Sequence, residues 1–125
     1  MNFLDDLFIL QSIEATANGF TALLCCNASH PVYLAHFPGN PITPGACLLK
    51  TAREAMQTFK GRKLALKTAK TIKYLSILIP AEGKTVRLEF SNLTEIEDGC
   101  KTQLVIADDD AVYSKMSLTF SYESL

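Results

Sequence analysis

An α+β fold, in which an antiparallel sheet of about six strands wraps around one long central helix, is the architecture that the sequence predicts. An apolar pattern with the 3.6-residue period of a helix lies between Thr43 and Gly61. Two strand-like segments precede it, and an apolar period of two follows it as far as Phe120. A helix and a sheet with one apolar face each can bury those faces against one another. With 125 residues, 48% of them apolar, we expect a single domain over residues 1–125.

The first two strands are predicted to form a hairpin. Residues Phe8–Ala15 are rich in apolar side chains, and Asn18-Gly19 after them is a dipeptide typical of tight hairpin turns. Phe20–Ala28 is then the returning strand. The segment from Ser29 to Thr43 contains three of the five prolines, which predicts an ordered irregular loop. Within that loop His30 is expected to be exposed.

The central helix is predicted to begin at Thr43-Pro44-Gly45 and to end at Gly61. The Thr43 hydroxyl can cap the helix by accepting a hydrogen bond from a first-turn N–H, and Pro44 suits the first helical position. Ala46 and Cys47 widen the apolar side, so the helix is expected to be buried on more than one side. The apolar positions at helical spacing are Leu48, Leu49, Ala52, Ala55, Met56 and Phe59.

Four further strands are predicted after Gly61. The first is long, and Leu64, Leu66, Thr68, Lys70, Ile72 and Tyr74 are expected to share one of its faces before Pro80 and Gly83 break it. The others are marked by Val86–Phe90, by Leu104 with Ile106, and by Val112–Phe120. The acidic triplet Asp108-Asp109-Asp110 is read as a hairpin turn rather than a metal site. A sheet this small leaves an edge open, which invites dimerisation.

Composition excludes several classes of function. A formal charge of −1 provides no electrostatic attraction to nucleic acid or anionic lipid. The first residues are acidic where a signal peptide needs basic residues, and the longest apolar run, Leu75–Ile79, is too short to span a bilayer. We therefore expect a cytoplasmic protein without a membrane span. Its cysteines, Cys25, Cys26, Cys47 and Cys100, lack metal-ligand spacing and are expected to be free and mostly buried. No metal and no cofactor is expected.

The proline- and glycine-rich loop that starts at His36 carries the chemistry. Its prolines and glycines fix a backbone path that delivers His36 to the start of the buried helix. The first-turn N–H groups of a helix have no partner inside the helix and can bind a developing negative oxygen. A histidine beside such a site is an arrangement of base and electrophile.

The run His36-Phe37-Pro38-Gly39-Asn40-Pro41-Ile42-Thr43-Pro44-Gly45 resembles the signature of the β-hydroxyacyl-acyl-carrier-protein dehydratases of fatty-acid synthesis. The segment from Ile72 to Gly83 is similar to the strand of that family that ends in a Pro-Gly-Asp turn. The resemblance implies a hotdog fold and an obligate dimer, with two active sites at the interface and a tunnel for an acyl chain on phosphopantetheine. It implies that His36 is the base and that the Gly45 N–H polarises the thioester carbonyl. Phe37, Gly39, Ala46 and Tyr33 are the associated substrate-binding candidates.

One position departs from the family. The acidic residue expected fourteen positions after the motif histidine is replaced by Lys50. Lys50 can act as the acid if burial lowers its pKa. Glu54, one turn further along the helix, can substitute for the missing carboxylate or activate water in a thioesterase. In a third reading, the chain is a degenerate subunit that completes its site with a carboxylate-bearing partner, or a module that binds acyl carrier protein.

The expected partners follow from these readings. The substrate is a thioester of acyl carrier protein or of coenzyme A. The chain is expected to form a homodimer or a higher oligomer, with a heterodimer with another hotdog chain as the alternative. No nucleic-acid partner is expected.

Overall fold

The structure, a computed structural model, describes residues 4–35 and 42–124. The predicted order of two strands, a long helix and four strands is confirmed. The predicted irregular loop contains one additional short helix, α1, which its proline-rich sequence did not predict. The elements in chain order are β1 (Phe8–Ala15), β2 (Phe20–Cys26), α1 (Val32–Ala35), α2 (Gly45–Lys60), β3 (Leu64–Tyr74), β4 (Thr85–Ile96), β5 (Gly99–Ala107) and β6 (Val112–Tyr122).

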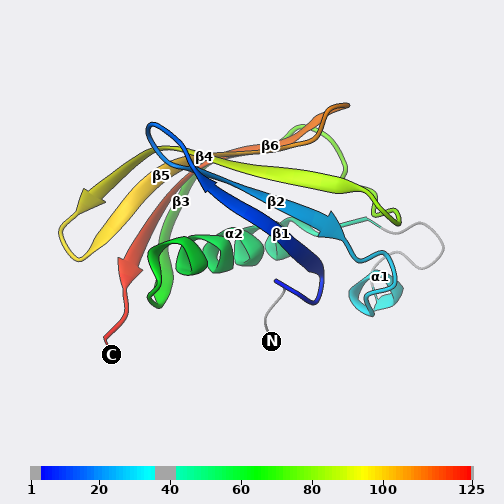
Figure 1. The fold of residues 1–125 in the computed structure, drawn as a ribbon, viewed down its shortest axis with the longest axis horizontal. Helices are drawn as coiled ribbons and strands as arrows, with labels where there is room; N and C mark the ends of the chain where they lie inside the picture. The colour runs from blue at the N-terminus through cyan, green and yellow to red at the C-terminus, as the bar shows by residue number, and fades with distance from the viewer. Residues whose placement is uncertain (1–3, 36–41, 125) are drawn as a thin grey trace.

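The strands form one six-stranded sheet in the order β1-β2-β4-β5-β6-β3, and all of its pairings are antiparallel. Figure 1 shows that the sheet curves over α2, which lies along its inner face. β1 and β3 are the two edge strands. The predicted α+β arrangement is therefore present, and the open edge that the sequence suggested lies at β3 as well as at β1.

The β1–β2 hairpin forms where Asn18-Gly19 predicted it. The Thr16 N–H donates to the Gly19 carbonyl at 3.0 Å and closes the turn. A Cβ atom at Gly19 would collide with the Phe90 carbonyl on β4. Glycine is therefore required here because another strand passes close to the backbone.

The start of α2 differs from the prediction by one residue and in its capping. Pro44 is the N-cap residue, and no side chain caps the helix. The prediction that Thr43 caps the helix is wrong, because its hydroxyl lies 3.0 Å from the Tyr33 hydroxyl instead. Gly61 ends the helix as predicted, in the left-handed conformation at φ 70°.

The buried side of α2 is broad, as expected, but it includes residues that the apolar pattern did not mark. Thr51 and Glu54 are buried, and the Thr51 hydroxyl donates to the Cys47 carbonyl at 2.8 Å. The expectation that Ala46 widens the buried side is wrong, because Ala46 is exposed at the first turn. The buried residues of the helix are Cys47, Leu48, Thr51, Ala52, Glu54, Ala55 and Met56.

The edge strand β3 does not keep the single alternating face that its sequence predicted. Its pairing with β6 shifts register between Leu66 and Thr68 and again between Lys70 and Lys73. Thr71, inside the second irregularity, has a φ of 53°. Each inserted residue turns the following side chains to the other face.

An aromatic stack joins the helix to the sheet near the C-terminal end of α2. The Phe20 ring on β2 stacks on Phe59 of α2, with ring centroids 4.1 Å apart. On its other side it stacks on Phe90 of β4 at 4.3 Å. Phe20 and Phe90 are fully buried, so this stack fixes how the helix lies across β2 and β4.

The segment after β3 is held between β6 and the entry to α2. The N–H groups of Leu75 and Ser76 donate to the Tyr113 carbonyl of β6, at 2.8 and 3.3 Å. Three residues later, the Leu78 carbonyl accepts a hydrogen bond of 2.9 Å from the Thr43 N–H. The segment therefore runs directly beside the start of the helix.

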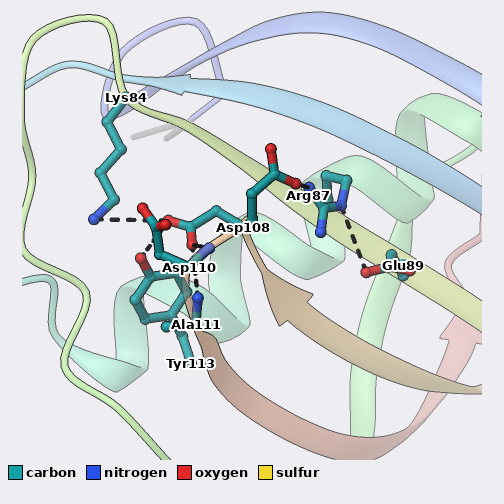
Figure 2. A network of polar contacts seen from close by, with 8 residues as sticks. Lys84, Arg87, Glu89, Asp108, Asp110, Ala111 and Tyr113 are labelled. Atoms are coloured by element: carbon teal, nitrogen blue, oxygen red, sulfur yellow. Dashed lines mark hydrogen bonds and ion pairs between the residues drawn. The ribbon is translucent and has the colours of Figure 1, made fainter.

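A polar network anchors the other end of this segment (Figure 2). Asp108 accepts hydrogen bonds from the Tyr113 hydroxyl and from the backbone N–H groups of Asp110 and Ala111. The Lys84 Nζ lies 3.7 Å from the Asp108 Oδ2. The predicted turn at the acidic triplet is thus confirmed. It ties the start of β4 to the β5–β6 connection.

The network also sets the protonation of Asp108. Desolvation is the largest single influence and acts to raise the pKa of the Asp108 carboxyl. The hydrogen bonds from Tyr113, Asp110 and Ala111, together with the Lys84 charge, outweigh it and leave the pKa below its ordinary value. The folded state therefore stabilises the ionised carboxylate.

We predict that Phe20→Ala destabilises the fold by about 3–5 kcal/mol, because it removes a fully buried ring and leaves a cavity beside two others. Urea unfolding of the variant and the wild type measures this change in the free energy of unfolding. Ile9→Ala at an exposed position of β1 is the matched control and should change it by about 0.5 kcal/mol or less. Equal effects of the two substitutions would contradict the prediction.

We predict that Asp108→Asn removes a pH-dependent part of the stability. Since the folded-state pKa is depressed, the stabilisation is present above the unfolded-state pKa of about 4 and is lost as the pH falls through the folded-state pKa. The difference in unfolding free energy between wild type and variant should thus shrink below about pH 4. Asp109→Asn, which removes an exposed carboxylate from the same turn, should show little of this dependence. A difference that does not vary with pH would argue against it.

Candidate active site

The structure describes five of the eight site residues that the sequence predicted. His36, Phe37 and Gly39 lie outside the described residues, and the roles assigned to them stay predictions. The five others are Tyr33 on α1, Gly45 and Ala46 at the entry to α2, and Lys50 and Glu54 further along that helix.

The entry to α2 presents backbone N–H groups at a defined position. Pro44 is extended, at φ −64° and ψ 144°, and its carbonyl accepts the N–H groups of Cys47 at 3.0 Å and Leu48 at 3.3 Å. Gly45 and Ala46 therefore precede the first hydrogen bonds within the helix, and their N–H groups point away from it. Such groups favour a negatively charged oxygen, since they also lie at the positive end of the helix dipole.

Tyr33 supports the helix entry from α1. Its side chain is buried, and its hydroxyl lies 3.0 Å from the Thr43 Oγ1, one residue before Pro44. Burial is the main cause that raises the pKa of Tyr33 to about 12. The hydroxyl therefore stays protonated and links α1 to the residue that precedes the helix.

His30 is buried, and the expectation that it is exposed is wrong. Only 5% of its surface is accessible. Its Nδ1 accepts a hydrogen bond of 3.0 Å from the Val32 N–H at the start of α1. Its Nε2 lies 3.3 Å from the Asp6 Oδ2. The imidazole thus joins the N-terminal segment to α1, a role that the neighbouring proline gave no reason to expect.

Tyr74, at the end of β3, reaches the same helix entry. A Cβ atom placed on Gly45 would lie 2.6 Å from both the Cζ and the Oη of Tyr74. The phenol tip therefore occupies the space that a side chain at position 45 would need. The alternating pattern of the sequence predicted that Tyr74 lies on a strand face but gave no link to the site, because only the fold brings residues 45 and 74 together.

Lys50 lies on α2, between the helix entry and the buried middle of the helix, and is half-buried. Burial, as the main cause, raises the pKa of the nearby Cys47 thiol, and the positive charge of Lys50 partly offsets this. Cys47 is therefore kept as a neutral thiol, which agrees with a core role and not with a nucleophile.

Glu54 is buried deeper along the same helix, with 4% of its surface accessible. Its Oε1 accepts a hydrogen bond of 3.1 Å from the Leu4 N–H. The carboxylate therefore holds the N-terminal segment against the helix. Positions 50 and 54 are one helical turn apart, about 5.4 Å, so both lie on the same side of α2.

The described residues do not form a metal centre. Among residues 4–35 and 42–124, no three His, Cys, Asp or Glu side chains gather as metal ligands do. All four cysteines are free thiols, and Cys26, Cys47 and Cys100 are buried as expected. No helix in the described part of the chain is long and apolar enough to cross a membrane.

Comparison with solved structures identifies the fold. The chain superimposes on a chain of "The Dehydratase Heterocomplex ApeI:P" from Xenorhabdus doucetiae with a TM-score of 0.72 and 18% identity, covering 91% of this chain and 97% of that one. A putative thioesterase from Lactococcus lactis matches with a TM-score of 0.65 and 14% identity, over 98% of this chain and 97% of the other. A hypothetical thioesterase solved with coenzyme A, from Streptococcus pneumoniae, matches with a TM-score of 0.61 and 11% identity, over 94% and 86%. These likenesses confirm the predicted hotdog fold.

Sequence comparison points to dehydratases. A 3-hydroxyacyl-[acyl-carrier-protein] dehydratase FabZ from Zymomonas mobilis is 26% identical in an alignment of length 122, and the match covers 90% of this chain and 77% of the relative. The FabZ of Ehrlichia ruminantium is 23% identical in an alignment of length 107, and that match covers 78% of this chain and 72% of the relative. The family model of ApeI-like proteins, described as ApeI dehydratase, matches residues 12–121. Since that match spans nearly the whole sequence, the chain belongs to the ApeI-like family of dehydratases.

Proposed function

We propose that this protein is a dehydratase that removes water from 3-hydroxyacyl thioesters. The observation that carries the proposal is the entry to α2 at Gly45, whose N-cap residue Pro44 supplies no capping side chain. The first-turn N–H groups are thereby left to a ligand oxygen rather than to the helix's own cap. Membership of a dehydratase family supports the same reaction.

The proposed reaction is a β-elimination. His36 takes the proton from the carbon next to the thioester carbonyl, and the freed electron pair forms the carbon–carbon double bond. The carbon–oxygen bond at the β-carbon breaks, and the hydroxyl takes a proton and leaves as water. The negative charge that develops on the thioester oxygen is stabilised by the Gly45 N–H. The products are a 2-enoyl thioester and water.

Lys50 is proposed as the source of the proton for the leaving hydroxyl. An ammonium group donates a proton but carries a charge opposite to that of the usual carboxylate. The proton that His36 has taken then passes through solvent to the neutral amine, which restores both groups. Glu54 is a weaker candidate for this step, because its carboxylate is buried and already accepts the Leu4 N–H.

A second candidate function is that of a subunit that completes its site with a different hotdog chain. The position of Lys50 favours it, because a homodimer of this chain has no carboxylate there. The similar ApeI:P dehydratase is itself a heterocomplex. In this arrangement the chain contributes His36 and the Gly45 N–H, and the partner contributes the carboxylate.

We propose assembly through the β3 edge in either case. The side chains that follow this edge form an exposed apolar ridge, with accessible fractions of 51% for Leu75, 60% for Ile77 and 51% for Ile79. An apolar ridge beside an unpaired strand edge is suited to contact with a second chain. The acyl group is carried by acyl carrier protein or by coenzyme A, both of which present it on a pantetheine arm.

We predict that the protein converts a 3-hydroxyacyl thioester to the enoyl thioester, measured by the absorbance of the conjugated product. His36→Ala should lower kcat by about 100-fold or more, since it removes the general base. Lys50→Met should have a similar effect, whereas His30→Gln, at a histidine outside the site, should lower kcat little if the variant is folded.

The same assay separates the alternatives. Wild-type protein that is inactive alone, but gains activity with Lys50→Glu, favours the subunit that needs a carboxylate from a partner. Release of free thiol instead of enoyl product would indicate a thioesterase and contradict the proposed dehydration.

We predict that Ile77→Asp weakens self-association at least tenfold, because it places a charge in the apolar ridge at the proposed interface. Light scattering after size-exclusion chromatography measures the mass at several concentrations. Ile9→Asp, at an exposed position of the other edge strand, is the matched control and should leave the mass unchanged. Dissociation by Ile9→Asp with none by Ile77→Asp would place the interface at β1 instead.

A further inference from the structure

We infer that Tyr74 is a thioester-binding residue of the proposed active site, with its hydroxyl as a second hydrogen-bond donor beside the Gly45 N–H. The inference rests on the proposed function and specifies how the site holds its substrate.

The phenol tip, and not the body of the ring, lies at the helix entry. The atoms of Tyr74 nearest to a Cβ built on Gly45 are Cζ and Oη at 2.6 Å and Cε1 at 2.9 Å. Since a Cβ lies about 1.5 Å from its Cα, the hydroxyl oxygen is within about 4 Å of the Gly45 Cα. Because the N–Cα bond adds about 1.5 Å, the hydroxyl oxygen is also within about 5.5 Å of the Gly45 nitrogen, a separation that one ligand oxygen can span with two hydrogen bonds of about 2.9 Å.

The backbone around Tyr74 is held by hydrogen bonds to β6 at the end of β3. Tyr74 pairs with Ser114 of β6, and the Ser114 hydroxyl donates to the Lys73 carbonyl at 3.0 Å. The next residue, Leu75, donates its N–H to the Tyr113 carbonyl. The backbone position is therefore fixed, and the side-chain rotamer of Tyr74 alone decides where the ring lies.

Packing within the subunit does not explain why the ring lies there. Its accessible fraction is 54%, whereas a tyrosine that serves the core buries most of its ring. Among the residues that the structure describes, none forms a hydrogen bond with the Tyr74 hydroxyl. A half-exposed phenol whose hydroxyl has no hydrogen-bond partner among the described residues, placed against a glycine at a helix N-terminus, is suited to a ligand oxygen.

The requirement for glycine at position 45 follows from the same contact. Gly45 has no left-handed backbone angle that would demand glycine, so the missing Cβ serves the close approach of Tyr74. Alanine is the better helix former, and the phenol tip can rotate away from a new methyl group. Gly45→Ala should therefore preserve folding and displace Tyr74 from the site.

The test uses the full chain and two probes. One is a 3-hydroxyacyl pantetheine thioester, for turnover. The other is the corresponding amide, which does not react, for binding followed by the NMR shift of the Gly45 N–H. Tyr74→Phe should lower kcat by about 100-fold with little change in KM, as expected for loss of one donor to a developing oxyanion. Tyr74→Ala should also weaken binding of the amide at least fivefold.

Tyr122→Phe is the matched control, because it removes a hydroxyl that binds Glu95 at the far end of β6. It should keep wild-type turnover. Gly45→Ala should lower kcat in the wild type but cause no further loss when combined with Tyr74→Ala, because both changes remove the same contact. Circular dichroism and thermal unfolding verify that each variant is folded.

The outcomes separate the two proposals. Wild-type turnover in folded Tyr74→Phe and Tyr74→Ala variants overturns the inference and leaves the proposed function intact. Fully additive losses in Gly45→Ala and Tyr74→Ala also overturn it. A wild-type protein that neither turns over the thioester nor binds the amide at Gly45 overturns both proposals.

Discussion

The hydrogen bond from the Thr43 N–H to the Leu78 carbonyl is the contact on which the arrangement of the candidate site depends. It joins the residue that precedes α2 to the segment that follows β3, two parts of the chain separated by the whole helix and one strand. Because Pro44 has no N–H and Thr43 does not cap the helix, contacts with other segments fix the position of the helix entry. Thr43 is held on one side by the Leu78 carbonyl and on the other by Tyr33.

Further contacts fix the position of α2 at both of its ends. The segment that carries Leu78 is attached to Tyr113 through Leu75, and the Tyr113 side chain is attached to Asp108. Asp108 in turn faces Lys84, where β4 begins (Figure 2). A chain of polar contacts therefore runs from the β5–β6 turn to the start of the central helix. The buried aromatic stack at Phe20 fixes the opposite end of α2, so the helix is positioned at both ends by different means.

Most of the fold was predictable because it follows from local patterns. The hairpin at Asn18-Gly19, the helix stop at Gly61 and the turn at the acidic triplet each depend on the conformational preferences of a few adjacent residues. The bulges of β3 were not predictable, since its residues fit an alternating pattern equally well and the shift arises from pairing with β6. His30 was misjudged for a similar reason. Its side chain contacts Asp6, which is far from it in sequence, so only the fold brings the two together.

The candidate site shows the same division. The motif from His36 to Gly45 could be recognised in the sequence because prolines and glycines constrain the backbone at their own positions. The contact between Gly45 and Tyr74 was not visible, because nothing near Tyr74 in the sequence distinguishes it from a packing residue. The sequence also suggested Glu54 as a substitute acid. The structure adds that its carboxylate is occupied by the Leu4 N–H, which only the three-dimensional arrangement could reveal.

The replacement of a carboxylate by Lys50 changes the electrostatics of the proposed site in two opposite ways. In the proposed site, an ammonium at position 50 that faces the catalytic imidazole favours its neutral form, which is the form that acts as a base. The same charge disfavours the imidazolium that forms once the α-proton has been taken. In a dehydratase with this lysine, a larger fraction of the histidine is therefore in its basic form. The transfer of the α-proton to that histidine, however, becomes less favourable. This unfavourable effect is smaller if the lysine proton has moved to the leaving hydroxyl by then, because the ammonium becomes a neutral amine. Proton donation by Lys50 and proton removal by His36 are thus favoured when they occur together.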